Sequence, residues 1–242
     1  MMHETLSHES NKLTEHTDEF LAMVSHELRT PIMAILGWIE LLNHMPADQV
    51  TVAQAVSVIK RNAQLQAQLV DELMDYSSIT ANKFSLTTRR LALGPIIKAA
   101  VEALVPMARK KSINLEVELA ALESETEGDG LRLQQVFSNL LSNAIKFTPF
   151  GGTVKVRLED SDVYHKIIVS DTGAGISAEF LPFIFDRYRQ ARPATASGGL
   201  GLGLTIAHHI IELHGGTITA DSCGAGQGAV FTVQLPRMQS GQ

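Results

Sequence analysis

Residues 21–42, LAMVSHELRTPIMAILGWIELL, decide the fold of the first third of the chain. Apolar positions recur there in alternating steps of three and four residues, at Leu21, Val24, Leu28, Pro31, Ile35, Trp38 and Leu42. This spacing is that of a helical heptad seam. A looser copy of the pattern follows at Val52, Val56, Ile59, Ala63, Val70 and Leu73. The turn at residues 44–48 separates the two stripes, so the pattern predicts an antiparallel two-helix hairpin.

Such a hairpin has little core of its own, and most helical stability in proteins comes from packing. Two copies would bury both seams in a four-helix bundle, so we predict a homodimer. The alternative is that the hairpin packs on the second domain of the same chain. The regularity of the first seam favours the dimer.

Composition limits the kind of protein this can be. The 242 residues include 20 Lys and Arg and 26 Asp and Glu, a net charge of −6, which disfavours a general nucleic-acid binder. The single cysteine, Cys223, excludes an internal disulfide framework and fits a reducing compartment. No apolar run approaches the ~20 residues of a membrane helix, and the polar N-terminus is not a signal peptide. We therefore expect a cytoplasmic protein with no membrane segment and no nucleic-acid partner.

Charge and glycine mark a domain boundary near residues 77–84. Residues 1–80 hold 4 basic and 11 acidic residues, net −7, and Gly37 is the only glycine before Gly94. Beyond that point, alternating or continuous apolar runs predict strands at 113–119, 154–158, 163–170, 217–221 and 229–235. Helical stripes fall at 96–108, 131–147 and 202–213. We predict a helical domain over 1–80 and an α/β domain over 81–242. Residues 190–199, poor in apolar side chains, are expected to form a mobile, lid-like loop.

His26 is the first candidate for chemistry. It falls at heptad position f, opposite the seam, so its imidazole should be exposed to a bulky phosphate donor. Glu27 is placed to orient the ring or accept its proton, and Thr30 follows one helical turn later, which should bring its hydroxyl beside the imidazole. Pro31 should bend the helix. In the alternative reading Thr30 caps a separate helix and His26 is an ordinary surface histidine. The seam that continues across Pro31 favours one bent helix.

Three polar residues share one face of the helix expected at 131–147. Asn139 and Asn143 are four residues apart, and Lys146 follows three residues later. Amide oxygens suit a hard cation such as magnesium, and a lysine ammonium suits a phosphate oxygen. By itself an asparagine pair is weak evidence, because both amides can also bond to backbone or solvent.

Two glycine-rich elements follow. Asp171 begins the run DTGAGI at the end of an apolar strand, where a Gly-X-Gly turn lets a ligand approach the backbone. Residues 198–204, GGLGLGL, open a helical stripe, and a glycine-rich helix start offers free N–H groups to an anion. The first element alone is also typical of an ordinary tight turn. The second matches neither a dinucleotide fingerprint nor a phosphate-binding loop with its lysine.

In this order and spacing, the elements resemble the core of the sensor histidine kinases of two-component systems. Residues 25–31 resemble the phospho-accepting box, 139–148 the asparagine box, 171–176 the first glycine box, 180–188 the phenylalanine box and 199–204 the last glycine box. The resemblance covers about residues 14–236. One departure is Leu200, which stands where many relatives have threonine or serine.

The resemblance implies a dimerisation and histidine-phosphotransfer hairpin, followed by an ATP-binding α/β sandwich of the gyrase, chaperone and histidine-kinase type. It implies an ATP-dependent protein-histidine kinase that phosphorylates His26 and passes the phosphoryl group to an aspartate in the receiver domain of a response regulator. It also implies phosphatase activity toward that regulator and an unidentified sensor domain or sensor protein. Whether the chain is an excised core or a soluble kinase with a separate sensor stays open.

The resemblance also assigns roles to residues at matching positions. The implied catalytic residues are His26 as phosphoryl acceptor, Glu27 as general base and Thr30, which would position water. The implied magnesium ligands are Asn143 and, in support, Asn139. The implied ATP-binding residues are Asn139, Asn143, Lys146, Phe147, Asp171, Gly173, Gly175, Gly199, Leu200, Gly201, Leu202 and Gly203. Asp171 would accept the adenine amino group, and Arg187 or Arg189 is a further phosphate candidate.

Two other functions compete with this interpretation. The first is a dimeric pseudokinase that binds nucleotide without transferring phosphate, against which the intact His26, Asn143, Lys146 and Asp171 argue. The second is a serine kinase or ATPase of the same superfamily, which would leave the hairpin with its outward histidine unexplained.

Overall fold

The computed structural model describes residues 2–44, 48–120, 124–186 and 200–238, with side chains from residue 22 onward. The expected loop at 190–199 and the candidates Arg187, Arg189 and Gly199 lie outside these residues. The described chain forms two compact units that meet within a helix, at Ser77 and Ser78. We call them the helical unit and, after the role expected from the sequence, the catalytic unit.

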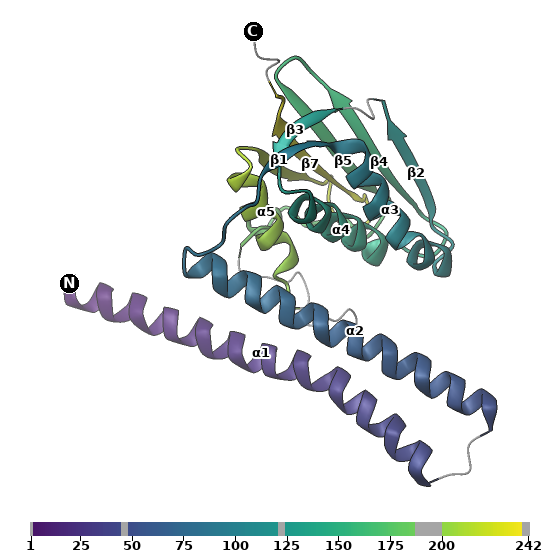
Figure 1. The fold of residues 1–242 in the computed structure, drawn as a ribbon. Coiled ribbons are helices and arrows are strands. Elements are labelled where there is room, and N and C mark those ends of the chain that lie inside the picture. Colours follow the sequence, from purple (N-terminus) through teal and green to yellow (C-terminus); the bar gives the residue numbers. More distant parts are fainter. Residues whose placement is uncertain (1, 45–47, 121–123, 187–199, 239–242) are drawn as a thin grey trace. The chain divides into compact units, whose positions relative to one another are not determined.

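Two long antiparallel helices make up the helical unit, α1 (Met2–His44) and α2 (Gln49–Thr80) (Figure 1). The helix α1 runs on through Pro31, so Thr30 does not cap a separate helix. Asp48 caps the start of α2, because its Oδ1 accepts a hydrogen bond of 2.7 Å from the backbone N–H of Thr51. This bond lowers the pKa of the Asp48 carboxyl. The predicted hairpin is confirmed.

A large part of the apolar surface of the hairpin stays exposed in the single chain. Pro31, Ala55 and Leu69 are buried. The exposed apolar side chains include Ile32, Met33, Leu36, Ile39, Val52, Val56, Leu65, Val70 and Met74. Three residues of the second predicted stripe, Val52, Val56 and Val70, therefore stay at least 40% exposed in one chain. This is the exposure that a four-helix bundle of two copies requires, and the dimer stays a prediction.

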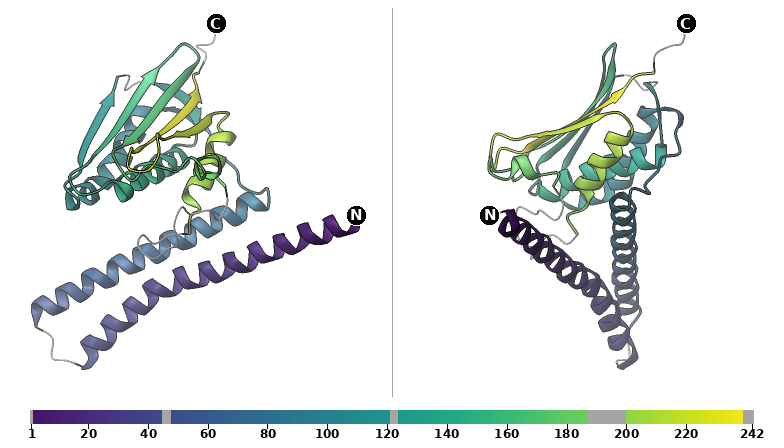
Figure 2. Two further views of the ribbon diagram at one scale, coloured as in Figure 1. Left: turned by 180° about the vertical axis from the view of Figure 1, so that it is seen from behind. Right: turned by 90° about the vertical axis from the view of Figure 1, so that its left-hand side faces the viewer.

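The catalytic unit is built on a five-stranded sheet with the order β2-β4-β5-β7-β6. Its strands are β2 (Asn114–Leu119), β4 (Thr153–Asp160), β5 (Tyr164–Asp171), β6 (Thr217–Asp221) and β7 (Ala229–Pro236). The pair β2 and β4 is parallel, and the other pairs are antiparallel. The helices α3 (Leu93–Lys110), α4 (Gly130–Phe147) and α5 (Gly203–Leu213) cover one face of the sheet (Figure 2). The expected α/β sandwich is confirmed.

Alternation along the strands decides which face the helices cover. Val154, Val156 and Leu158 are at most 1% exposed and face the helices, whereas Lys155 and Arg157 between them point to the open face. The helix α4 supplies the largest share of the helical side of the core. Its buried residues are Leu133, Val136, Phe137, Leu140, Leu141, Ala144 and Ile145. The opposite side of α4 is therefore left for polar residues.

A second, small sheet was not expected from the sequence. The strand β1 (Arg89–Ala92) pairs antiparallel with β3 (Glu125–Gly128). A polar cluster around the buried His165 holds β3 to the large sheet. The Nδ1 atom of His165 lies 2.7 Å from Asp160 Oδ1, and its Nε2 lies 2.9 Å from the carbonyl oxygen of Glu125. Ser124 Oγ donates to Asp160 at 2.8 Å. The pKa of Asp160 is lowered, because burial raises it but the bonds from His165 and Ser124 outweigh that effect.

None of the helices in the described part of the chain combines the length and the apolar character that crossing a membrane requires.

Candidate functional site

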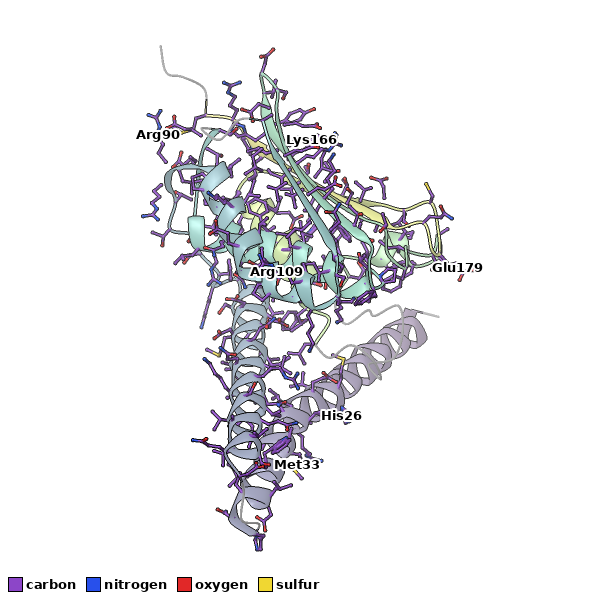
Figure 3. The ribbon with its side chains drawn as sticks, turned by 90° about the vertical axis from the view of Figure 1, so that its right-hand side faces the viewer. His26, Met33, Arg90, Arg109, Lys166 and Glu179 are labelled. Carbon is purple, nitrogen blue, oxygen red and sulfur yellow. The ribbon has the colours of Figure 1, made fainter. Side chains whose placement is uncertain are left out.

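His26 lies on α1 with its imidazole in solvent (Figure 3). The side chain is 76% exposed, while that of its neighbour Glu27 is only 10% exposed. The Oε1 atom of Glu27 lies 3.6 Å from Nδ1 of His26. At 3.6 Å the carboxylate is beyond ordinary hydrogen-bond distance and lies on the Nδ1 side of the ring, so Nε2 is the nitrogen away from the acidic neighbour. The arrangement suits an imidazole that acts as a nucleophile through Nε2.

The hydroxyl of Thr30 does not lie where the sequence suggested. It was expected beside the imidazole, but Thr30 Oγ1 donates a hydrogen bond of 3.0 Å to the backbone carbonyl of His26. Back-bonding of this kind is a common choice for a helical threonine, because the carbonyl one turn earlier is within reach. The role of Thr30 in positioning water stays a prediction, and it would require the hydroxyl to leave this carbonyl.

The three polar residues predicted on one face of α4 have different surroundings. Asn139 Nδ2 donates to the carbonyl oxygen of Gly203, 3.1 Å away, and so ties α4 to the start of α5. Asn143 is half-buried one turn further along. The ammonium of Lys146 lies 5.3 Å from the centre of the Phe147 ring, within range of a cation–π interaction. Metal ligation would use Oδ1 of either asparagine, and the bond to Gly203 engages only Nδ2 of Asn139, so both residues remain candidate ligands.

Lys111, which no sequence pattern singled out, fixes the end of α4. Its ammonium donates to three backbone carbonyls, those of Ile145 at 2.8 Å, Lys146 at 2.8 Å and Thr148 at 2.6 Å. Ile145 and Lys146 lie in the last turn of the helix and Thr148 directly follows it. Backbone acceptors at a helix end otherwise lack partners, and the helix dipole is negative there. The position of Lys146 and Phe147 therefore depends on a charge supplied by the turn after α3.

Asp171 ends β5 and opens the glycine turn. Its Oδ1 accepts a hydrogen bond of 2.8 Å from the backbone N–H of Gly173. Burial raises the pKa of this carboxyl, and the bonds from the N–H groups of Gly173 and Ala229 offset the effect only in part. A partly desolvated carboxylate is a strong acceptor for a ligand N–H group.

The glycines of this turn are required by close contacts. A Cβ at Gly173 would lie 2.7 Å from the carbonyl oxygen of Phe147. Gly175 has a φ of +68°, and a Cβ there would lie 2.0 Å from the carbonyl oxygen of Gly224. Any side chain at either position would displace the backbone. The turn is therefore a cradle packed between the end of α4 and the β6–β7 connection.

The β6–β7 connection is a part of the site that the sequence analysis missed. Ser222 Oγ accepts from the N–H of Ile176 at 3.0 Å and donates to the carbonyl of Gly228 at 2.6 Å. The N–H groups of Gly226 and Gly228 donate to the carbonyls of Ala174 and Gly173, at 2.6 and 3.1 Å. The three glycines in residues 224–228, between two predicted strands, were the available signal for a tightly packed turn.

The last glycine run leads into α5 as expected. Gly201 has a φ of +67°, and Gly203 is the first residue of the helix. Leu200 and Leu202 are fully buried, so they can offer a ligand only their backbone groups. The first N–H groups of a helix have no partner within it, and they form an anion site together with the positive end of the dipole.

The residues present fit a magnesium nucleotide better than a bare metal. The described residues contain no group of three His, Cys, Asp or Glu side chains that could hold a metal ion. Amide oxygens on α4 and phosphate oxygens together make an oxygen-rich set of the kind that Mg²⁺ prefers. The cradle at Gly173 and Gly175 has no room for a side chain at either position.

Two family models match the chain. The His Kinase A (phospho-acceptor) domain matches residues 17–82, and the histidine kinase-, DNA gyrase B- and HSP90-like ATPase matches residues 128–239. The chain is 35% identical over 274 residues to the hybrid signal transduction histidine kinase D of Dictyostelium discoideum, covering 93% of this chain and 18% of that protein. It spans between 17% and 30% of the length of the curated relatives compared with it.

Two of the solved structures that resemble this chain align with most of it. Full-length ShkA in complex with AMPPNP has a TM-score of 0.68 and 26% identity, covering 93% of this chain and 47% of that chain. The histidine kinase ThkA in complex with the response regulator TrrA has a TM-score of 0.66 and 26% identity, covering 96% and 66%. The chain belongs to the sensor histidine kinases of two-component systems, and the expected family is confirmed.

Proposed function

We propose that the chain is the catalytic core of a protein-histidine kinase that transfers the γ-phosphoryl group of ATP to its own His26 and then to an aspartate of a response regulator. The observation that carries the proposal is the exposed imidazole of His26 with the Glu27 carboxylate 3.6 Å from its Nδ1. The match of both kinase domains to this chain supports it.

The residues would act in turn. Nε2 of His26 forms a bond to the γ-phosphorus while the bond from that phosphorus to the bridging oxygen breaks, and ADP leaves. Glu27 accepts the proton from Nδ1 as the ring gains positive charge, so the product is a neutral phosphohistidine ring. In the second step the receiver aspartate takes the phosphoryl group and the imidazole recovers its proton.

The catalytic unit would bind the nucleotide at the residues described above. Asp171 would accept a hydrogen bond from the adenine amino group, and the backbone at Gly201 and Gly203 would face the phosphates. Asn143, supported by Asn139, would hold Mg²⁺, which supplies charge neutralisation at the phosphates when it is bound. Phe147 and Lys146 would border the same pocket.

The partners are part of the proposal. The exposed apolar face of the hairpin supports a homodimer, and the likeness to a histidine kinase in complex with a response regulator supports that partner. The placement in the cytoplasm, the phosphatase activity and a sensor in the same or another protein stay predictions from the sequence.

Labelling with ATP that carries a tagged γ-phosphate tests the proposal. Wild type with Mg²⁺ should gain a label that is acid-labile and alkali-stable. His26→Gln should abolish the label and leave nucleotide binding intact. His44→Gln is the matched control, because His44 is also on α1, is 71% exposed and has a carboxylate 3.4 Å from its Nδ1, that of Glu40. This control should label like wild type.

Three outcomes would count against the proposal. Label that survives in the His26→Gln variant would show that a residue other than His26 accepts the phosphoryl group. An acid-stable label would indicate a serine kinase. Wild type that binds ATP and never labels would indicate a pseudokinase. Asn143→Ala should lose both magnesium-dependent nucleotide binding and label.

A further inference from the structure

Thr205, which no motif singled out, lies in the first turn of α5 and is 9% exposed. Its Oγ1 atom lies 3.0 Å from the carbonyl oxygen of Phe185 and 3.3 Å from that of Asp186, with the hydroxyl as donor. Both acceptors belong to the segment after the short 3₁₀ helix Leu181–Phe183. One hydroxyl thus joins the start of α5 to a segment about twenty residues earlier in the chain.

The same turn of α5 is held from a second side. Asn139 Nδ2 on α4 donates to the carbonyl of Gly203, two residues before Thr205. The Phe185 ring lies 5.2 Å from the ring of His208 and 6.4 Å from that of Phe231, measured between centroids. Aromatic packing therefore fixes the Phe185 segment, and Thr205 attaches the turn to a fixed partner.

The start of α5 is held in the core by the buried Leu200 and Leu202, but the glycines that alternate with them add no side-chain contact. Gly201 and Gly203 have no side chain, and Gly201 is in the left-handed region. The rest of α5 is secured by the core, since Ile206, Ile210 and Ile211 are fully buried. Loss of the hydroxyl should therefore loosen the turn while the helix and the fold remain.

We propose that Thr205 is a positioning residue for the nucleotide: its hydroxyl fixes the first turn of α5, and so the direction of the free N–H groups that receive the phosphates. The inference rests on the proposed function, which places the phosphates at this helix start. Thr205 does not touch the nucleotide in this scheme. Its effect is on the binding of nucleotide and not on the transfer step.

The test compares Thr205→Val, which keeps the shape and removes the hydroxyl, with Thr205→Ser, which keeps the hydroxyl. Calorimetric titration with ADP and Mg²⁺ should show about five-fold weaker binding for the valine variant, the factor that one ordinary hydrogen bond represents. The affinity of the serine variant for ADP should lie within about two-fold of that of wild type. In the labelling assay the valine variant should need about five-fold more ATP for half-maximal labelling rate and should keep the maximal labelling rate of wild type.

Melting of the nucleotide-free variants separates positioning from damage to the fold. If the valine variant does not fold, Thr205→Ala replaces it in the comparison with the serine variant. Alanine also lacks the hydroxyl, and it leaves room for water at the carbonyls of Phe185 and Asp186. Equal affinity of the valine variant and wild type would overturn the inference, and so would equal weakening by valine and serine. A wild type that binds no nucleotide would instead remove the proposed function itself, together with this inference.

Discussion

Replacement of Lys111 by methionine should destabilise the catalytic unit and leave the helical unit unchanged. The ammonium of Lys111 donates to three carbonyls at the end of α4, at 2.8, 2.8 and 2.6 Å. Methionine has a similar stem and no donor. The three acceptors, those of Ile145, Lys146 and Thr148, would lose their common partner in a half-buried position.

The magnitude follows from three contributions. A hydrogen bond that involves a charged group contributes about 1.5–3 kcal/mol, but three bonds from one ammonium are not additive. A cation at a helix C-terminus adds about 0.3–1 kcal/mol. Lysine and methionine lose similar side-chain entropy, about 1.5–2 kcal/mol, when they are ordered, so this contribution cancels. We expect a net loss of about 3 kcal/mol in the free energy of unfolding, which lowers Tm by about 6–12 °C for a domain of this size.

Scanning calorimetry of the full chain measures the catalytic unit. The fluorescence of Trp38, the single tryptophan, reports the helical unit because Trp38 lies in α1, and its transition should not move. Lys110→Met is the matched control, since Lys110 is the exposed neighbour in the last turn of α3. A Lys111→Met variant that melts within about 1 °C of the Lys110→Met variant would refute the reasoning.

Two further predictions concern carboxylates with shifted pKa values. Asp171→Asn should weaken ATP binding about ten-fold, because the ligand N–H group loses a charged acceptor. The nucleotide-free variant should nevertheless melt no lower than wild type. The reason is that burial disfavours the native charge and raises the pKa of Asp171. The pKa of the Asp160 carboxyl is lowered in the folded protein, so its ionised form stabilises the fold at pH values above its ordinary pKa of about 4. This stabilisation is lost as the pH falls through the lowered pKa. Urea titrations at pH 3–7 should therefore show a shallower acid loss for Asp160→Asn; an equal slope would contradict the assignment.

The strands and helices that pack on the core were predictable because their patterns are local. Strict alternation at Val154, Val156 and Leu158 marked β4, and β6 was predicted at its observed bounds, Thr217–Asp221. The small sheet escaped because β1 and β3 are short and carry charges: Arg89, Arg90, Glu125 and Glu127 all lie in them. Their stability comes from partners far away in sequence, which no local pattern records.

The same distinction applies to the site. Residues that would touch the ligand stand in recognisable boxes, so the sequence indicated them. The residues that hold those motifs in place lie far from them in the sequence. Lys111 contacts the end of α4, Ser222 contacts the first glycine turn, and Thr205 contacts the Phe185 segment. The hydroxyl of Thr30 shows the opposite limit, because helical spacing alone could not distinguish a turn toward the imidazole from a turn toward a carbonyl.

Because helix α1 is unbroken, the direction of the His26 side chain around the helix axis depends on the number of residues that precede it in the helix. Its 43 residues extend about 65 Å at 1.5 Å per residue, without a break at Pro31. Each residue added or removed between Met2 and His26 turns the imidazole by about 100° relative to the start of the helix, whereas seven residues turn it by only about 20°. Deletion of one residue before His26 would thus turn the proposed phosphoryl acceptor by a large angle, and deletion of seven residues would turn it by a small one.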